Sequence, residues 1–129
     1  MTPALPDGHP YDRLVGPFHD TDGLAQWRSV APETITTAAL GDRLVACQLD
    51  GGGWVFPVWQ FTDAGEARPE VLALWAVLRA GGDRWMCALW LRSPQPELGD
   101  RTALDWLDDG RPVDAALDLA RAAVLVWAS

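Results

Sequence analysis

The stretch Asp83–Gly110, DRWMCALWLRSPQPELGDRTALDWLDDG, has the pattern of a helix, a proline-rich elbow, a second helix and a glycine stop. Its first large apolar residues recur at the three- and four-residue spacing of one helical face: Trp85, Met86, Leu89 and Trp90. A residue before proline is pushed out of the α region, so the first helix should end near Ser93. The stretch therefore predicts two helices joined by a short, stiff elbow.

The second helix of this stretch should begin at Thr102, which forms an approximate capping box with Asp105. Gly110 is a natural left-handed stop for that helix. Pro112 fits the first turn of a following helix, where its missing N–H costs nothing. We expect this last helix to run to Trp127, with one apolar face formed by Val113, Ala116, Leu117, Ala120, Val124 and Trp127.

A further helix should precede the opening stretch, from Pro69 to about Ala80. Its predicted buried stripe consists of Val71, Leu74, Trp75 and Leu78. The pair Gly81-Gly82 should end it, and Asp83 should cap the next helix. Residues 69–129 therefore predict a helical bundle.

The first half of the chain predicts smaller elements. Residues 1–15 are rich in proline and predict a loose arm. Residues 16–61 predict two short helices and two strands joined by a glycine-rich turn: Asp20 or Thr21 to Arg28, Glu33–Leu40, Arg43–Leu49 and Trp54–Phe61. Pro57 cannot donate to a ladder, so the N–H side of this residue should be an edge. Two short helices followed by a hairpin is the order of a small winged helix-turn-helix. The predicted fold class is therefore mainly α, a helical bundle with a small antiparallel β-hairpin.

Composition limits the classes of partner. The net charge is −8 and every basic residue is arginine, so the phosphate backbone of nucleic acid repels the chain as a whole. This balance favours a basic protein as partner. We expect a cytoplasmic protein, because the chain opens without a signal-peptide pattern and has no apolar run long enough to span a bilayer. Cys47 and Cys87 are expected to be reduced core residues.

Residues for chemistry are sparse. Nucleophilic catalysis needs a base beside the nucleophile, and His9 and His19, the two histidines, lie in or near the predicted arm. Cys47 and Cys87 lack the closely spaced partners of a zinc site. The side chains of the pair Asp108-Asp109 should point in different directions, so we expect the pair to lie at a helix end. A metal site formed by carboxylates alone stays an open alternative. We otherwise expect no enzyme activity, no cofactor and no metal.

The opening stretch also resembles the Xre/MbcA/ParS-type antitoxin toxin-binding domain. The matching residues are Trp90-Leu91, Pro94, Pro96, Leu98-Gly99-Asp100-Arg101-Thr102, Leu104, Leu107 and Gly110. Asp100 stands where that family usually has a second glycine, and Ala103 stands where it usually has proline. The N-terminal half resembles a unit that often precedes this domain, through Gly16-Pro17-Phe18 and the run Phe56-Pro57-Val58-Trp59-Gln60-Phe61.

This resemblance implies the antitoxin of a type II toxin–antitoxin pair. Its partner would be a RES-type toxin that consumes NAD, and neutralisation would be steric, by covering the toxin's NAD cleft. The residues predicted to contact the toxin are Trp90, Arg92, Pro94, Pro96, Leu98, Arg101, Thr102, Val124, Trp127 and Ser129.

Two alternatives stay open from the sequence. The first is a DNA-binding transcriptional regulator, an autorepressor, with contacts from Arg28, Thr34, Thr36, Thr37 and Arg43. The predicted reading helix Glu33–Leu40 contains threonines and an acid but no cation, which favours a winged-helix shape kept as scaffold. The second alternative is a homodimeric scaffold protein that uses its tryptophan-rich surface for self-association.

Overall fold

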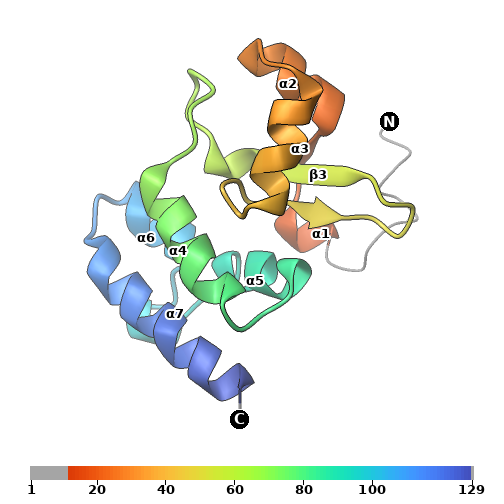
Figure 1. Ribbon diagram of the computed structural model, residues 1–129. Helices are drawn as coiled ribbons and strands as arrows, with labels where there is room; N and C mark the ends of the chain where they lie inside the picture. Colours follow the sequence, from red (N-terminus) through yellow and green to blue (C-terminus); the bar gives the residue numbers. More distant parts are fainter. Residues whose placement is uncertain (1–11, 129) are drawn as a thin grey trace. The chain divides into compact units, whose positions relative to one another are not determined.

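The computed structural model describes residues 12–128, which form two compact units divided in sequence between Ala67 and Arg68. The N-terminal half is unit 1 and the C-terminal half is unit 2. Both are rich in helix, and unit 1 adds a small antiparallel sheet (Figure 1). The predicted fold class, mainly α with a small antiparallel sheet, is confirmed.

Unit 1 alternates short helices with short strands. In order these are α1 (Asp12–Val15), β1 (Phe18–Asp20), α2 (Thr21–Arg28), α3 (Pro32–Leu40), β2 (Cys47–Gln48), β3 (Trp54–Pro57) and the 3-10 helix η1 (Val58–Gln60). The sheet is antiparallel with strand order β1-β3-β2. The predicted hairpin is therefore present as β2 and β3, whereas β1 was not predicted from the sequence.

The strands are shorter than predicted, and a buried glutamine explains one boundary. The side chain of Gln60 is fully buried and accepts a hydrogen bond from Val45 N–H at 2.7 Å. Its amide nitrogen donates to Val45 O at 2.7 Å and to Pro57 O at 3.0 Å. Both backbone groups of Val45 are thus bound to a side chain instead of a neighbouring strand, so β2 begins only at Cys47.

Pro57 lies beyond the ladder between β2 and β3, which reaches only Trp54 and Val55 of β3. β3 is the central strand of the sheet, because β1 pairs with one of its edges and β2 pairs with the other. Pro57 is nevertheless tolerated, because it is the last residue of β3, opposite Phe18, and the chain turns into η1 directly after it.

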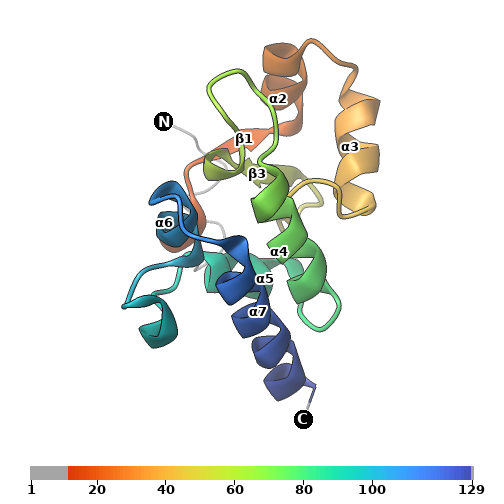
Figure 2. The ribbon, with the colours of Figure 1, turned by 90° about the vertical axis from the view of Figure 1, so that its left-hand side faces the viewer.

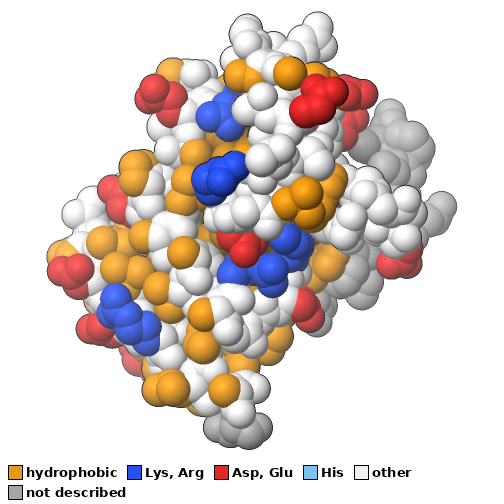
Figure 3. Space-filling model, viewed as in Figure 1, with side chains coloured by type: hydrophobic (Ala, Val, Ile, Leu, Met, Phe, Trp, Pro, Cys, Tyr) orange, Lys and Arg blue, Asp and Glu red, His pale blue; other side chains and the backbone are white. Residues whose placement is uncertain are grey.

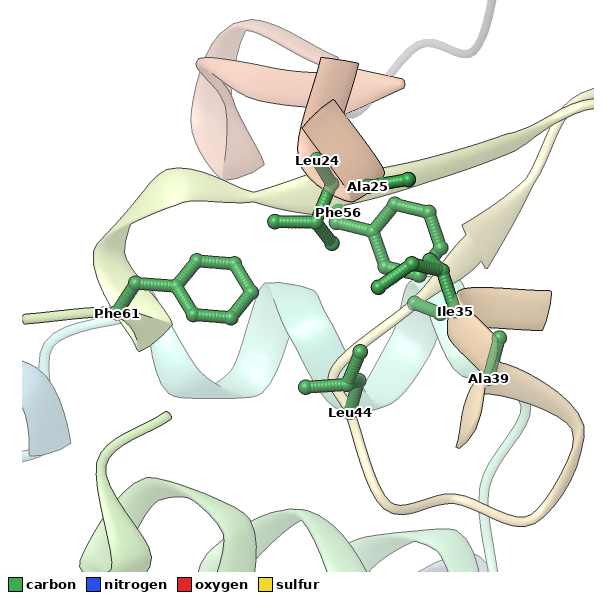
Figure 4. Packing of buried hydrophobic residues seen from close by; sticks show 8 residues of the cluster. Leu24, Ala25, Ile35, Ala39, Leu44, Phe56 and Phe61 are labelled. Carbon is green, nitrogen blue, oxygen red and sulfur yellow. The ribbon is translucent and has the colours of Figure 1, made fainter. Parts of the chain in front are cut away.

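The core of unit 1 lies between α2, α3 and β3 (Figure 4). Its buried residues are Leu24, Ala25, Ile35, Ala39, Leu44, Ala46, Phe56 and Phe61. Asp20 caps α2 as predicted, by accepting a hydrogen bond from Gly23 N–H at 2.7 Å. The end of the predicted arm differs from expectation, because residues 12–15 form α1 and Val15 is fully buried. Residues 1–11 lie outside the described part of the chain.

Unit 2 consists of helices joined by short turns. In order these are α4 (Pro69–Arg79), α5 (Arg84–Leu91), the 3-10 helix η2 (Pro96–Leu98), α6 (Ala103–Asp108) and α7 (Val113–Trp127). The predicted stripe of α4 is confirmed, since all four of its side chains are fully buried. Helix α7 runs beside α4 (Figure 2) and also contacts α6.

Helix α5 buries a different stripe from the predicted one. Its buried residues are Trp85, Cys87, Ala88 and Leu91, whereas Met86, Leu89 and Trp90 are only half-buried. The sequence-based stripe followed the largest side chains. Packing instead selects the face centred on the small residue Ala88, where a neighbouring element can approach closely.

The turn Gly81-Gly82 between α4 and α5 admits the end of α7 at close range. A Cβ atom at Gly81 would lie 2.6 Å from Val124 Cγ1. One at Gly82 would lie 2.7 Å from Trp127 Cζ3 and 2.9 Å from Cys87 Sγ. Carbon atoms in good contact are about 3.5–4.0 Å apart, so a side chain here would push α7 away.

We predict that Gly82→Ala lowers the free energy of unfolding by about 1–3 kcal/mol, the usual cost of overpacking. Gly51→Ala is the matched control, because its added Cβ would meet nothing within 4 Å. Urea denaturation of both variants measures the difference. Equal stability of the two variants would contradict the close approach of α7 to this turn.

Candidate functional site

The proline elbow of unit 2 is a closed turn. Gln95 and Arg101 pair as an isolated antiparallel bridge, with Gln95 N–H donating to Arg101 O at 2.9 Å. Between them Gly99 and Asp100 both have positive φ, at 69° and 63°. Leu98 points into the protein and is 1% exposed. Leu98 therefore packs the elbow from inside, and we assign it this role in place of the partner contact predicted from sequence.

Arg101 and Thr102 fasten the elbow to α6. Arg101 Nε donates to Asp109 Oδ2 at 2.9 Å, and its Nη1 donates to Leu98 O at 3.3 Å. Thr102 Oγ1 accepts from Asp105 N–H at 3.0 Å, which confirms it as the cap of α6. Much of the hydrogen-bonding capacity of these predicted contact residues is thus used within unit 2.

The outer side of the elbow carries the accessible residues. Arg92, Pro94 and Pro96 are exposed, and Trp90 is half-buried at the end of α5. Proline side chains at an exposed turn form a rigid apolar surface, because the backbone has little freedom to lose on binding. These residues can still contact a partner.

The end of α7 divides its apolar residues between two faces. Val124 and Trp127 face the Gly81-Gly82 turn, so they pack within unit 2. The next two apolar residues face away, with Leu125 72% exposed and Val126 71% exposed. Hydrophobic side chains are visible over the α7 region in Figure 3. Ser129, also predicted as a contact, lies outside the described residues.

The sequence contains a signal for this division. Ala116, Ala120, Val124 and Trp127 follow helical spacing and form the packed face of α7. Residues 125 and 126 lie 100° and 200° around the helix from Val124, so they cannot share that face. We call Leu125 and Val126 the α7 apolar pair.

The residues predicted to contact DNA lie mainly on or beside α3. Thr34 and Thr37 are exposed, and Arg43 is exposed after the helix. Thr36 differs, because its Oγ1 donates to Pro32 O at 3.2 Å. A shallow hollow at the start of α3 is lined by Pro32, Glu33, Thr36 and Thr37, so the charge that the described residues bring to it is negative.

Arginine is unevenly divided between the units. Residues 1–67 contain three arginines and nine acidic residues, and residues 68–129 contain seven arginines and nine acidic residues. One of the three, Arg28, lies over the ring of Phe61, with its guanidinium carbon 5.5 Å from the ring centre. The unit that holds α3 is therefore the more acidic of the two, which opposes binding of a polyanion there.

An aromatic cluster lies beside Arg28 in unit 1. His19 stacks on Trp27 with ring centres 5.0 Å apart, and both rings meet Phe61 edge-on at 6.0 and 5.8 Å. Trp27 is 44% exposed. Burial lowers the pKa of His19 below its usual 6.5, and the charge of Asp20 opposes this shift.

Neither a metal centre nor a membrane span is found in residues 12–128. No group of three or more histidine, cysteine or acidic residues there could hold a metal ion. No helix in the same residues is long and apolar enough to cross a bilayer. Cys47 and Cys87 are buried and form no disulfide.

We predict that His19 titrates below pH 6.5 in NMR spectra of the imidazole protons, and that Trp27→Ala moves its pKa back toward 6.5. Because the folded chain binds this proton less readily than the unfolded chain, stability is full above pH 6.5. It should decrease as the pH falls from 6.5 to the lower folded pKa. His9 gives a second histidine signal for comparison in the same spectra. A His19 pKa at or above 6.5 would contradict the burial of this ring.

Comparison with known proteins supports the fold and leaves the family open. The NMR structure of Rv2175c is similar to this chain, with a TM-score of 0.71 and 23% sequence identity over 94% of this chain and 90% of that one. At this level of identity the similarity concerns the fold alone. No family model matches the chain, and no curated protein matches it. The resemblance to the antitoxin family stays a prediction.

Proposed function

We propose that the chain is the antitoxin of a type II toxin–antitoxin system, acting in the cytoplasm, which binds and sterically neutralises a RES-type, NAD-consuming toxin. Unit 2 is the part that binds. To neutralise the toxin by covering its NAD cleft, the chain needs a rigid surface and no reactive group. The proposal therefore gives no residue of this chain a catalytic role.

The observation that carries this proposal is the α7 apolar pair. Two adjacent aliphatic side chains, each more than 70% exposed, stand on a 15-residue helix that is packed on its other side. Contiguous exposed apolar surface is one mark of a protein-binding site, and this pair would contribute to such a surface. The helix is held in place by its close approach to Gly81-Gly82, so little conformational entropy would be lost on binding.

The elbow would provide a second contact surface for the toxin in the same unit, with prolines beside an arginine. Arg92, Pro94 and Pro96 are exposed there, and the turn beneath them is closed by backbone hydrogen bonds. The resemblance to the antitoxin domain rests on this same stretch. The acidic character of the whole chain suits docking near a cleft that binds an anionic dinucleotide, because such a cleft is basic.

We predict that the product of the neighbouring open reading frame is toxic alone, and that it co-purifies with this chain and is silenced by it. Leu125→Asp should weaken the complex by roughly tenfold or more, because a carboxylate would be buried against apolar surface. Co-expression growth assays and titration calorimetry measure the two effects.

Leu40→Asp is the matched control, because Leu40 is 65% exposed but lies in unit 1. It should leave the affinity unchanged. Sedimentation of the free variants shows whether the chain self-associates as a homodimeric scaffold and whether Leu125→Asp affects that association instead. A neighbour that is harmless alone and never co-purifies would refute the antitoxin proposal.

DNA-binding regulation is the second candidate, and the order of elements favours it. Helices α2 and α3 are separated by three residues, the length of a helix-turn-helix connection, and are followed by the β2–β3 hairpin. The scarcity of arginine in unit 1 argues against it. A mobility shift on the chain's own promoter at low salt, with and without the neighbouring protein, is the test, and no shift in either condition would remove this candidate.

A further inference from the structure

Two arginines lie near one carboxylate at the end of α6. Arg101 comes from the elbow before α6, and Arg111 comes from the turn between α6 and α7. Arg101 Nε lies 2.9 Å from Asp109 Oδ2, and Arg111 Nε lies 4.0 Å from the same oxygen. The three side chains are 35%, 44% and 50% exposed for Arg101, Arg111 and Asp109. Asp109 is therefore shared, and it is bound closely only by Arg101.

An aromatic ring holds Arg111 in position. The guanidinium carbon of Arg111 lies 5.1 Å from the ring centre of Trp106. That ring is itself fixed, because Trp106 Nε1 donates to Pro112 O at 2.7 Å. The backbone closes the same turn, since Arg111 N–H donates to Trp106 O at 3.2 Å and Gly110 has a φ of 77°. The Arg111 side chain is thus oriented without a hydrogen bond of its own in residues 12–128.

Asp108, the acidic residue before Asp109, is paired with another arginine. Asp108 pairs with Arg68 at 2.8 Å. The group of Arg101, Arg111 and Asp109 consequently has one positive charge in excess. A guanidinium whose carbon lies over an aromatic ring still presents its N–H donors at the edge, in the fork geometry that matches a carboxylate.

We propose that Arg111, supported by Arg101 and Trp106, is a binding site for a carboxylate of a partner protein, supplied by an aspartate, a glutamate or a chain terminus. Arg111 donates from its N–H edge to the incoming carboxylate, and Asp109 holds Arg101 beside it. A carboxylate suits the site better than a phosphate, because a single excess positive charge balances one negative charge and leaves a dianion uncompensated. The proposal rests on the proposed partner-binding function for its biological role.

The test uses the free protein, so that it is independent of the toxin. Acetate is titrated into the full chain at constant ionic strength, with inorganic phosphate and sodium chloride in parallel arms, and NMR follows the Trp106 indole N–H and the Arg111 side-chain signals. With acetate we expect shifts at these two groups that saturate. Arg111→Gln should weaken the acetate affinity by about fivefold, the effect expected for losing one exposed charge pair.

Arg121→Gln is the matched control, because Arg121 is also exposed on unit 2 but is paired with Asp118 at 3.0 Å. It should leave the acetate titration unchanged, and the amide spectrum verifies the fold of each variant. Shifts that grow without saturation and equally in chloride would overturn the site. Tighter binding of phosphate than of acetate would overturn the assignment to a carboxylate. Saturable acetate binding without any co-purifying partner would keep the site and reject only its proposed role in toxin binding.

Discussion

The close contact between the last turns of α7 and the Gly81-Gly82 turn determines which surface unit 2 offers to other molecules. Val124 and Trp127 are held against backbone that has no side chain of its own. With 3.6 residues per turn, one rotation of the helix cannot also bury Leu125 and Val126. The two glycines therefore stabilise unit 2 because they have no side chain that would keep α7 away. Leu125 and Val126 stay exposed because the opposite face of α7 makes this contact. Hydrating that pair has a free-energy cost that only another molecule can remove.

Local chemistry predicted a large part of the fold. Asp20, Asp83 and Thr102 each cap a helix by accepting a backbone N–H from three residues ahead, an interaction decided by neighbours in sequence. The stripe of α4 was also predicted correctly, because its four apolar residues are the only large set at helical spacing in that segment. Where one short stretch contains all the partners of an interaction, residue types and spacing are sufficient.

Non-local partners explain what the sequence did not predict. Three residues of β1 have too little alternation to indicate a strand, and their pairing with β3 joins positions almost forty residues apart. In the sequence Gln60 lies in an apolar stretch that resembles a strand. Its role depends on the hydrogen bonds of its side-chain amide with Val45, fifteen residues earlier. The packed side of α7 is non-local for the same reason, because Val124 and Trp127 lie against Gly81 and Gly82, more than forty residues earlier. The sequence analysis did not select Arg111, because its proposed role depends on sharing Asp109 with Arg101. The fold of the elbow places Arg101 near Asp109.

Shape and charge are decided by different residues in unit 1, and this separation bears on function. The arrangement of α2, α3 and the hairpin follows from buried residues such as Leu24, Ile35 and Phe56. What α3 can bind depends on exposed positions, and these offer threonine, an acid and Leu40. A protein that neutralises phosphates with lysine or arginine gains affinity by releasing the counterions of DNA. Unit 1 has three arginines against nine acidic residues, so it would gain little affinity in this way. Unit 2 has seven arginines and the exposed apolar pair, and it is the unit on which we propose that a partner protein binds. A helix order shared with DNA-binding proteins is thus compatible with a chain that recognises protein alone.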